Sequence, residues 1–210
     1  KKRFVDLGVP SNEIVVIGTP RYLEKQQDYF FQVSPFSLKI LFITGVYYEM
    51  ELFADLLINN KDLSEKHEIK IRRSTHSWSE SEDKAENLLK NQGINYKCNK
   101  GDLIDDIDNA DVIIYESTSA AFQASLRGKI IIQMQLSDII PTKHFYELHG
   151  PNEIIFCKNA DDLREKLDWF ALMTKDQFND YAERQRKQVE MLYSKMSQKS
   201  FTGLFLDGNN

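Results

Sequence analysis

The chain has 210 residues and a net charge of −5, with acidic and basic residues mixed along its length. This charge argues against a nucleic-acid-binding protein, which would carry a basic face. No run of about 18 apolar residues is present, so the sequence predicts no transmembrane helix. Because 41% of the residues are hydrophobic and 28% are charged, we expect one globular domain with a substantial core.

Six short apolar runs follow residue 37, and their β-branched residues predict strands. The runs are Leu38–Ile43, Glu68–Arg72, Ile94–Cys98, Val112–Tyr115, Ile130–Met134 and Ile154–Cys157. The first, fourth and fifth are almost continuously apolar, as central parallel strands covered on both faces are. The second and third alternate between apolar and polar residues, which predicts positions nearer an edge of the sheet.

Helical patterns separate these runs, and Gly93 and Gly128 provide stops after two of them. The predicted helices are Glu49–Asn59, Ser79–Gln92, Asp102–Asn109, Thr118–Arg127, Ala160–Leu172 and a long charged helix from about Thr174 to Met196. The alternation predicts an α/β fold, a doubly wound parallel sheet of six strands with helices on both faces. We interpret the charged stretch Ala182–Lys187 as a solvated helix face.

Residues 1–37 fall outside this pattern. Residues 1–22 contain a strand-like run, Ile14–Ile17, and we assign them to a preceding domain, with 23–37 as a polar linker and 38–210 as the Rossmann-like domain. The chain begins at Lys1 without an initiator methionine, and we expect it to be a fragment. The apolar stretch Phe201–Leu206 is expected to dock on a surface.

The cysteines and acidic pairs give no sign of a metal site. Cys98 and Cys157 are isolated thiols in strand-like runs, and we interpret them as small buried hydrophobes in a reducing cytoplasm. No cysteine or histidine spacing matches a zinc site. The pair Asp105 and Asp106 lies on a short acidic helix and is interpreted as solvated, so we expect neither a metal nor a cofactor.

In an open α/β sheet, ligands bind beyond the carboxyl ends of the strands, where the strand order reverses. Gly45 leaves the first predicted strand just before the helix that begins at Glu49. A glycine there lets a ligand approach the backbone, and a helix N-terminus favours an anion. A simple tight turn is the alternative, since the dinucleotide fingerprint GxGxxG is missing.

Three hydroxyl residues follow the fourth predicted strand. Glu116 is followed by Ser117, Thr118 and Ser119, which lead into a helix of small residues. Hydroxyl donors, unpaired backbone N–H groups and the helix dipole converge here, so this exit predicts a phosphate site. The alternative is that one hydroxyl only caps its own helix.

Basic residues follow the second predicted strand. Arg72 and Arg73 could hold a diphosphate, and His76 could donate a proton to a leaving oxygen. A surface or capping histidine is the alternative interpretation of His76. The other histidines, His67 among them, lie in weaker contexts.

The order of these motifs resembles the C-terminal domain of GT-B fold glycosyltransferases, in particular bacterial surface and capsular polysaccharide enzymes, with kinship to CDP-glycerol polymerases and UDP-GlcNAc 2-epimerases. Leu7–Tyr22 resembles the stretch that closes their N-terminal domain, and Ala110–Lys129 resembles their donor-site segment. Arg73–Ser77 falls where these families carry a basic residue followed by His-Pro. The resemblance covers nearly the whole chain and implies that residues 1–22 end an N-terminal GT-B domain.

The resemblance implies roles for particular residues. Ser117–Ser119 would bind the donor phosphates, and Gly45 would admit a phosphate or the acceptor-side loop. His76 would approach the diphosphate or the transferred sugar as the catalytic residue. Arg73 and Glu116 are counted with the nucleotide-binding residues.

The sequence also departs from the family. Gln123 stands where these enzymes carry a glutamate that holds the ribose hydroxyls. It can still hydrogen-bond a ribose, and we count it with the nucleotide-binding residues, but it lacks the charge. Ser77 replaces the proline after His76. Ala124 takes the second position of the glutamate pair that many retaining enzymes have, so the choice between inversion and retention stays open.

These features imply the donor-binding half of a glycosyltransferase, which moves a sugar from a nucleotide-sugar to a surface polysaccharide or a lipid-linked acceptor. The general base would lie on the N-terminal domain, so this chain alone should bind its donor without turnover. The alternatives are an epimerase or a polyol-phosphate polymerase on the same fold, or a non-catalytic scaffold domain. We expect a cytoplasmic protein, with attachment to the inner membrane face left open, and no nucleic-acid partner.

Overall fold

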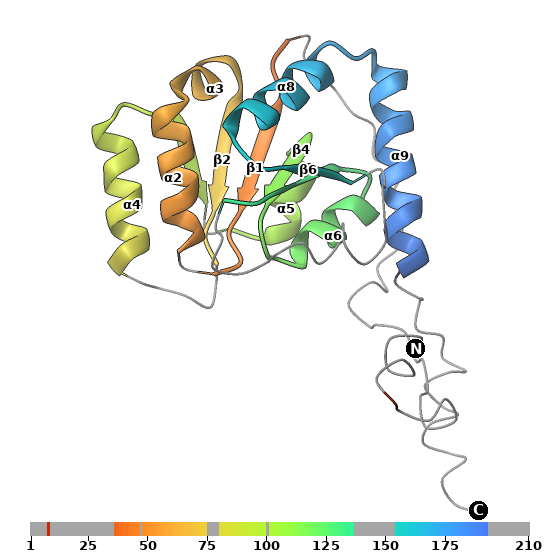
Figure 1. Cartoon of the computed structure of the whole chain (residues 1–210), viewed down its shortest axis with the longest axis horizontal. Coiled ribbons are helices and arrows are strands. Elements are labelled where there is room, and N and C mark those ends of the chain that lie inside the picture. The colour runs from red at the N-terminus through yellow and green to blue at the C-terminus, as the bar shows by residue number, and fades with distance from the viewer. Residues whose placement is uncertain are drawn as a thin grey trace, which may run out of the picture.

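The computed structural model describes residues 36–46, 48–74, 80–99, 101–136 and 154–192, together with Gly8. Its centre is a sheet of six parallel strands in the order β3–β2–β1–β4–β5–β6 (Figure 1). The strands are β1 Lys39–Ile43, β2 Glu68–Arg72, β3 Tyr96–Asn99, β4 Val112–Tyr115, β5 Ile130–Met134 and β6 Ile155–Cys157. The chain order reverses between β1 and β4, which confirms the predicted doubly wound α/β fold.

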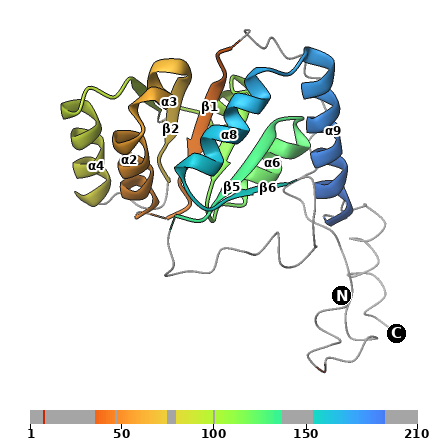
Figure 2. The same ribbon diagram turned by 45° about the horizontal axis from the view of Figure 1, so that its top comes forward.

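Helices pack on both faces of this sheet (Figure 2). They are α2 Glu49–Asn59, α3 Lys61–Lys66, α4 Glu80–Asn91, α5 Leu103–Asp108, α6 Ala120–Leu126, α8 Ala160–Ala171 and α9 Lys175–Leu192. One buried cluster takes its side chains from α2, α3, α4 and α8, and the other takes them from α5 and α6. Residues of α9 belong to both clusters, so this helix joins the two layers at one side of the sheet.

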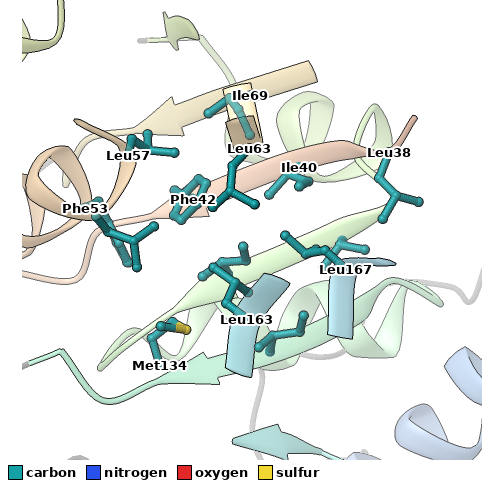
Figure 3. Close-up of a cluster of buried hydrophobic side chains, with 14 of the residues drawn as sticks. Leu38, Ile40, Phe42, Phe53, Leu57, Leu63, Ile69, Met134, Leu163 and Leu167 are labelled. Atoms are coloured by element: carbon teal, nitrogen blue, oxygen red, sulfur yellow. The ribbon is translucent and has the colours of Figure 1, made fainter. Parts of the chain in front are cut away.

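The strand period of two divides the side chains of β1 between these clusters. Ile40 and Phe42 point into the larger cluster (Figure 3). Leu41 and Ile43 belong to the smaller cluster. The ring of Phe42 packs edge-on against Phe53 of α2, with 5.0 Å between the ring centroids. Both faces of β1 are therefore buried, as its continuous apolar run predicted.

The strands predicted to lie nearer an edge do so, because β3 is an edge strand and β2 is its neighbour. On the face of β2 opposite Ile69 and Ile71, the side chains of Lys70 and Arg72 bind Asp106 of α5, at 2.5 and 2.6 Å. The solvated role expected for Asp106 is wrong, since only 1% of this residue is exposed. The polar face of β2 requires a counter-ion, and α5 provides it.

The stretch interpreted as a solvated face of α9 is also partly buried. Gln185 is fully buried, and its amide group accepts a hydrogen bond from the N–H of Ile131 and donates one to the C=O, at 2.8 and 3.0 Å. The short β6 pairs with β5 only from Ile132 onward. Gln185 therefore satisfies strand backbone that β6 is too short to reach.

Several boundaries differ from the predicted ones by one or two residues. α6 begins at Ala120 instead of Thr118, and β3 begins at Tyr96 instead of Ile94. The six-residue helix α3 was not predicted, because it is too short to show a helical period. The predicted run Ile14–Ile17, most of the linker and the stretch Phe201–Leu206 lie outside the described residues.

Both cysteines were predicted to be buried, and the structure buries one of them fully. Cys157 is buried and Cys98 is half-buried, and both are free thiols. Within the described residues, no helix has the length and apolar character needed to cross a membrane.

His67 has a structural position at the amino edge of the sheet. It lies between α3 and β2 with 3% of its surface exposed, and its Nδ1 accepts a hydrogen bond from the N–H of Leu38 at 3.3 Å. Burial, helped by the positive charge of Lys66, lowers the pKa of His67 to about 4. In the folded protein the side chain of His67 is therefore uncharged at neutral pH.

The lowered pKa of His67 predicts that the unfolding free energy decreases as the pH falls. An unfolded histidine takes up its proton near pH 6.5, so the contribution of neutral His67 is present above that pH and is lost as the pH falls through about 4. Urea unfolding at pH 7 and at pH 4 should show a larger loss of unfolding free energy in the wild type than in His67→Asn, whose amide oxygen can still accept from Leu38. Equal losses in both proteins would show that His67 does not cause the effect.

Candidate functional site

The ends of β1 and β4 meet at the point where the strand order reverses. Ile43 and Tyr115 are partners in the parallel register, so Gly45 and Ser117 each lie two residues beyond the same level of the sheet. In Figure 1 the arrowheads of β1 and β2 mark this edge at the lower side of the sheet. The structure thus brings together the two strand exits that the sequence singled out for phosphate binding.

These two turns touch each other. A Cβ atom added at Gly45 would lie 2.7 Å from Oγ of Ser117 and 3.1 Å from the backbone nitrogen of Thr118. Only glycine fits such a contact without displacing the opposite turn. The close approach that Gly45 permits is therefore to the β4–α6 turn, and its contact with a ligand stays a prediction.

A buried carboxylate joins the same two turns. Glu49 is the first residue of α2 and is fully buried. Its Oε2 accepts the N–H of Gly45 at 2.5 Å, and its Oε1 accepts the hydroxyl of Ser117. The N–H groups of Val46 and Ser117 also donate to this carboxyl group. Burial raises the pKa of Glu49, and these hydrogen bonds oppose the shift.

Sequence reasoning treated Glu49 only as the start of a helix. An acidic residue in the first turn of a helix is common, because the helix dipole favours it there. The available signal was its place four residues after a glycine at a strand exit, where a carboxylate can turn back onto the preceding N–H groups. The structure shows that it does so.

The three hydroxyl residues after β4 are used differently. Ser117 donates to Glu49, as described above, and Thr118 accepts the N–H of Ala120 at 3.3 Å. Ser119 is the N-cap residue of α6, but its side chain makes no capping hydrogen bond. Thr118 and Ser119 are half-buried, as is Gln123 within α6. Phosphate binding by Thr118 and Ser119 and ribose binding by Gln123 stay predictions.

Glu116 directly follows β4 and begins this turn. It is fully buried, its C=O accepts a hydrogen bond from the side chain of Gln133 at 3.2 Å, and its Oε1 accepts the N–H of Leu136 at 3.3 Å. These bonds fix the exit of β4 to the exit of β5. The structure gives Glu116 a supporting position, and direct nucleotide binding by it stays a prediction.

The exit of β2 is tied to β1 through Thr44. Its hydroxyl donates to the C=O of Arg72 at 3.2 Å and accepts the N–H of Ser74 at 2.8 Å. The exits of β2, β1, β4 and β5 are therefore connected by side chains of Thr44, Glu49 and Glu116. A ligand at this edge would meet one continuous and fixed surface.

Arg73 is held by helix α4. Its guanidinium lies 3.2 Å from Glu82, 2.7 Å from Asp83 and 3.4 Å from Glu86, and only 8% of the residue is exposed. Three carboxylates already balance the charge that we expected to face a diphosphate. Phosphate binding by Arg73 stays a prediction that requires these pairs to rearrange. His76, the predicted catalytic residue, lies outside the described residues.

The fold and the strand exits define a doubly wound α/β domain with its candidate ligand edge at the reversal of strand order. In the part of the chain that the structure describes, no group of three or more His, Cys, Asp or Glu residues is placed to hold a metal. No protein-family model and no curated protein matches the sequence.

Solved structures do match. The chain is similar to a glycosyltransferase from Rickettsia africae ESF-5, with 15% identity and a TM-score of 0.57 over 82% of this chain and 49% of that one. It is also similar to a protein from Listeria monocytogenes assigned as a UDP-N-acetylglucosamine 2-epimerase, with 13% identity and a TM-score of 0.57 over 100% of this chain and 57% of that one. The wall teichoic acid polymerase TagF matches with 13% identity and a TM-score of 0.50, over 80% and 40% of the two chains.

These likenesses show the fold. They confirm the predicted resemblance to the C-terminal domain of GT-B fold glycosyltransferases and to the polymerases and epimerases related to them. The chain spans between 40% and 57% of the length of these three proteins. At such low identity, the activity of this chain has to be argued from its own residues.

The contact at Gly45 predicts the effect of a single methyl group. Gly45→Ala should lower the unfolding free energy by about 1–3 kcal/mol, because overpacking a close contact costs this much. Ser117→Ala removes the nearest atom and should recover part of this loss of unfolding free energy. The rest of the loss should remain, because the added methyl group would still be crowded by Thr118. Urea unfolding of the single and double variants measures this coupling, and purely additive losses would contradict the contact.

The ion cluster around Arg73 predicts a structural role. Arg73→Met should lower the unfolding free energy by about 3–5 kcal/mol, because it removes a cation from the fully buried Glu82. Arg184→Met is the control, since the Arg184–Asp180 pair is largely exposed and should contribute no more than about 1 kcal/mol. If Arg73→Met instead leaves stability unchanged and abolishes nucleotide binding, Arg73 is a phosphate ligand.

Proposed function

We propose that this chain binds the nucleotide of an activated sugar at the carboxyl edge of its sheet, as the donor-binding half of a glycosyltransferase. The meeting of the Gly45 and Ser117–Ser119 turns carries this proposal. These turns lie where the strand order reverses, which is the place where open α/β sheets bind ligands. The shared fold with glycosyltransferases supports the nucleotide-sugar as the ligand class.

The proposed chemistry depends on positioning. Thr118 and Ser119 would donate to the donor phosphates, and the backbone at the start of α6 would add to the stabilisation of the leaving phosphate. His76 would approach the diphosphate or the sugar. The acceptor, a surface polysaccharide or a lipid-linked saccharide, and the general base would meet the donor on an N-terminal domain that residues 1–22 complete. This chain alone would then bind its donor without turnover.

A second candidate uses the same site for different chemistry. The Listeria protein assigned as an epimerase matches over 100% of this chain, which favours an epimerase as the alternative. A polyol-phosphate polymerase is the other alternative, through the likeness to TagF. A panel of activated donors would separate these candidates, because each class acts on a different activated group.

Titration with nucleotides tests the proposal. UDP, CDP, CMP, GDP and ADP are added in turn to the 210-residue chain, and binding is followed by calorimetry and by amide NMR. We expect saturable binding of one nucleotide, with shifts centred on Gly45 and Ser117–Ser119. The double variant Thr118→Ala, Ser119→Ala should bind at least about tenfold more weakly, because a hydrogen bond to a charged group contributes about 1.5–3 kcal/mol.

The matched control removes the same hydroxyl groups elsewhere. Helix α3, which carries Ser64, and the start of α9, just after Thr174, lie toward the opposite edge of the sheet from the candidate site (Figure 1), so Ser64→Ala, Thr174→Ala should bind as the wild type does. A folded wild-type chain that binds none of the five nucleotides at millimolar concentration would contradict the proposal. Equal losses in the two double variants would place the site elsewhere.

A further inference from the structure

The structure shows an acidic residue at a site proposed to bind an anion. Glu49 lies between the turns that carry Gly45 and Ser117, and it is fully buried there. A buried carboxylate is unfavourable unless hydrogen bonds compensate it, and here one hydroxyl and three N–H groups do so. Such a residue needs an explanation beyond local helix formation.

We propose that Glu49 is a positioning residue of the nucleotide site, which fixes the β1–α2 turn to the β4–α6 turn so that the hydroxyl groups of Thr118 and Ser119 are held ready for a ligand. This inference rests on the proposed function, because it assigns Glu49 a role in that same site. Glu49 is separated from Ser117 by 68 positions along the chain, so its hydrogen bond joins two turns that are independent in sequence.

The hydrogen bonds to Glu49 already use two donors that could otherwise bind a phosphate, the hydroxyl of Ser117 and the N–H of Gly45. The hydroxyl of Ser117 donates its only proton to Glu49, so it does not donate to a phosphate at the same time. The N–H of Gly45 points to Glu49 as well, at 2.5 Å, and is therefore already used. The ligand contacts fall to the residues that follow Ser117 in the same turn.

The close packing of the turns also leaves no room for a ligand between Gly45 and Ser117. The space at Gly45 is too small for a Cβ atom, since Oγ of Ser117 would lie 2.7 Å away. A phosphate cannot enter where a methyl group does not fit. The ligand is therefore placed on the residues that follow Ser117, and Glu49 acts on them through its bond to Ser117.

The first experiment needs no nucleotide. Amide NMR spectra of the free 210-residue chain are recorded as the pH is raised from 4. The amide signals of Gly45 and Ser117 should shift together, with one midpoint above 4.5, because both groups donate to the same carboxyl. The shifts should persist in Glu51→Gln, which neutralises an exposed acid in the same helical turn, and be lost in Glu49→Gln.

The second experiment measures affinity for whichever of the five nucleotides binds. Glu49→Gln should bind at least about tenfold more weakly than the wild type, and Glu51→Gln should bind equally well. Ser117→Ala breaks the same link without changing α2, so it should weaken binding by a similar factor. The double variant should bind no more weakly than either single variant, since both remove one shared interaction.

The outcomes separate the two proposals. If no nucleotide binds but the Gly45 and Ser117 signals respond to Glu49, the proposed function fails and the link between the turns remains. If a nucleotide binds to the wild type and equally or more tightly to both folded variants, the positioning role is overturned and the function stands. If Glu49→Gln does not fold, Ser117→Ala decides the question alone.

Discussion

The parallel pairing of β1 with β4 is the constraint on which the candidate site depends. The helices that follow these two strands pack on opposite faces of the sheet, α2 after β1 on one face and α6 after β4 on the other. The register that sets Ile43 beside Tyr115 also sets Gly45 beside Ser117. The hydrophobic core thus determines the geometry of a polar site, because a shift in register would expose apolar side chains of both strands.

Buried carboxylates hold the strand exits in fixed positions relative to one another. Glu49, Glu116 and Asp106 are at most 1% exposed, and each holds a group from another strand exit or from a neighbouring strand. Asp106 is compensated by two cations, whereas the partners of Glu49 among the described residues are neutral donors. Burial raises the pKa of Glu49, and the hydrogen bonds from these neutral donors oppose the shift. Buried carboxylates are usually paired with cations. A carboxylate that lacks such a partner among the described residues, at the edge where ligands bind, indicates a functional role.

The fold could be predicted because its information is local. The strands of the central pair are almost continuously apolar, and the alternation in β2 and β3 shows that those strands lie toward an edge. Gly93 and Gly128 follow α4 and α6 with positive φ angles of 69° and 77°, so the helix stops could also be read from the sequence. Helix α3 escaped prediction because six residues give no period.

The site could be predicted only in outline, because its contacts depend on strand order. The sequence showed which exits carry glycine, hydroxyl and basic residues, but not which side chains of different exits contact one another. The bond from Ser117 to Glu49, the capture of Arg73 by α4 and the pairing of Arg72 with Asp106 all join segments that only the folded sheet brings together. Gln185 shows the same limit, since its role follows from the short length of β6.

The low identity to proteins of the same fold has a physical meaning at this edge. Topology fixes where the strand exits meet, and it can persist at 13–15% identity because many apolar sequences satisfy the same core. The polar residues at the exits are under no such constraint from the core, and they can differ between proteins that share the sheet. The placement of the ligand edge can therefore be taken from the fold, whereas its chemistry has to be taken from Glu49, Ser117 and their neighbours. A binding preference in this chain should follow those contacts and not the activity of any one protein with the same fold.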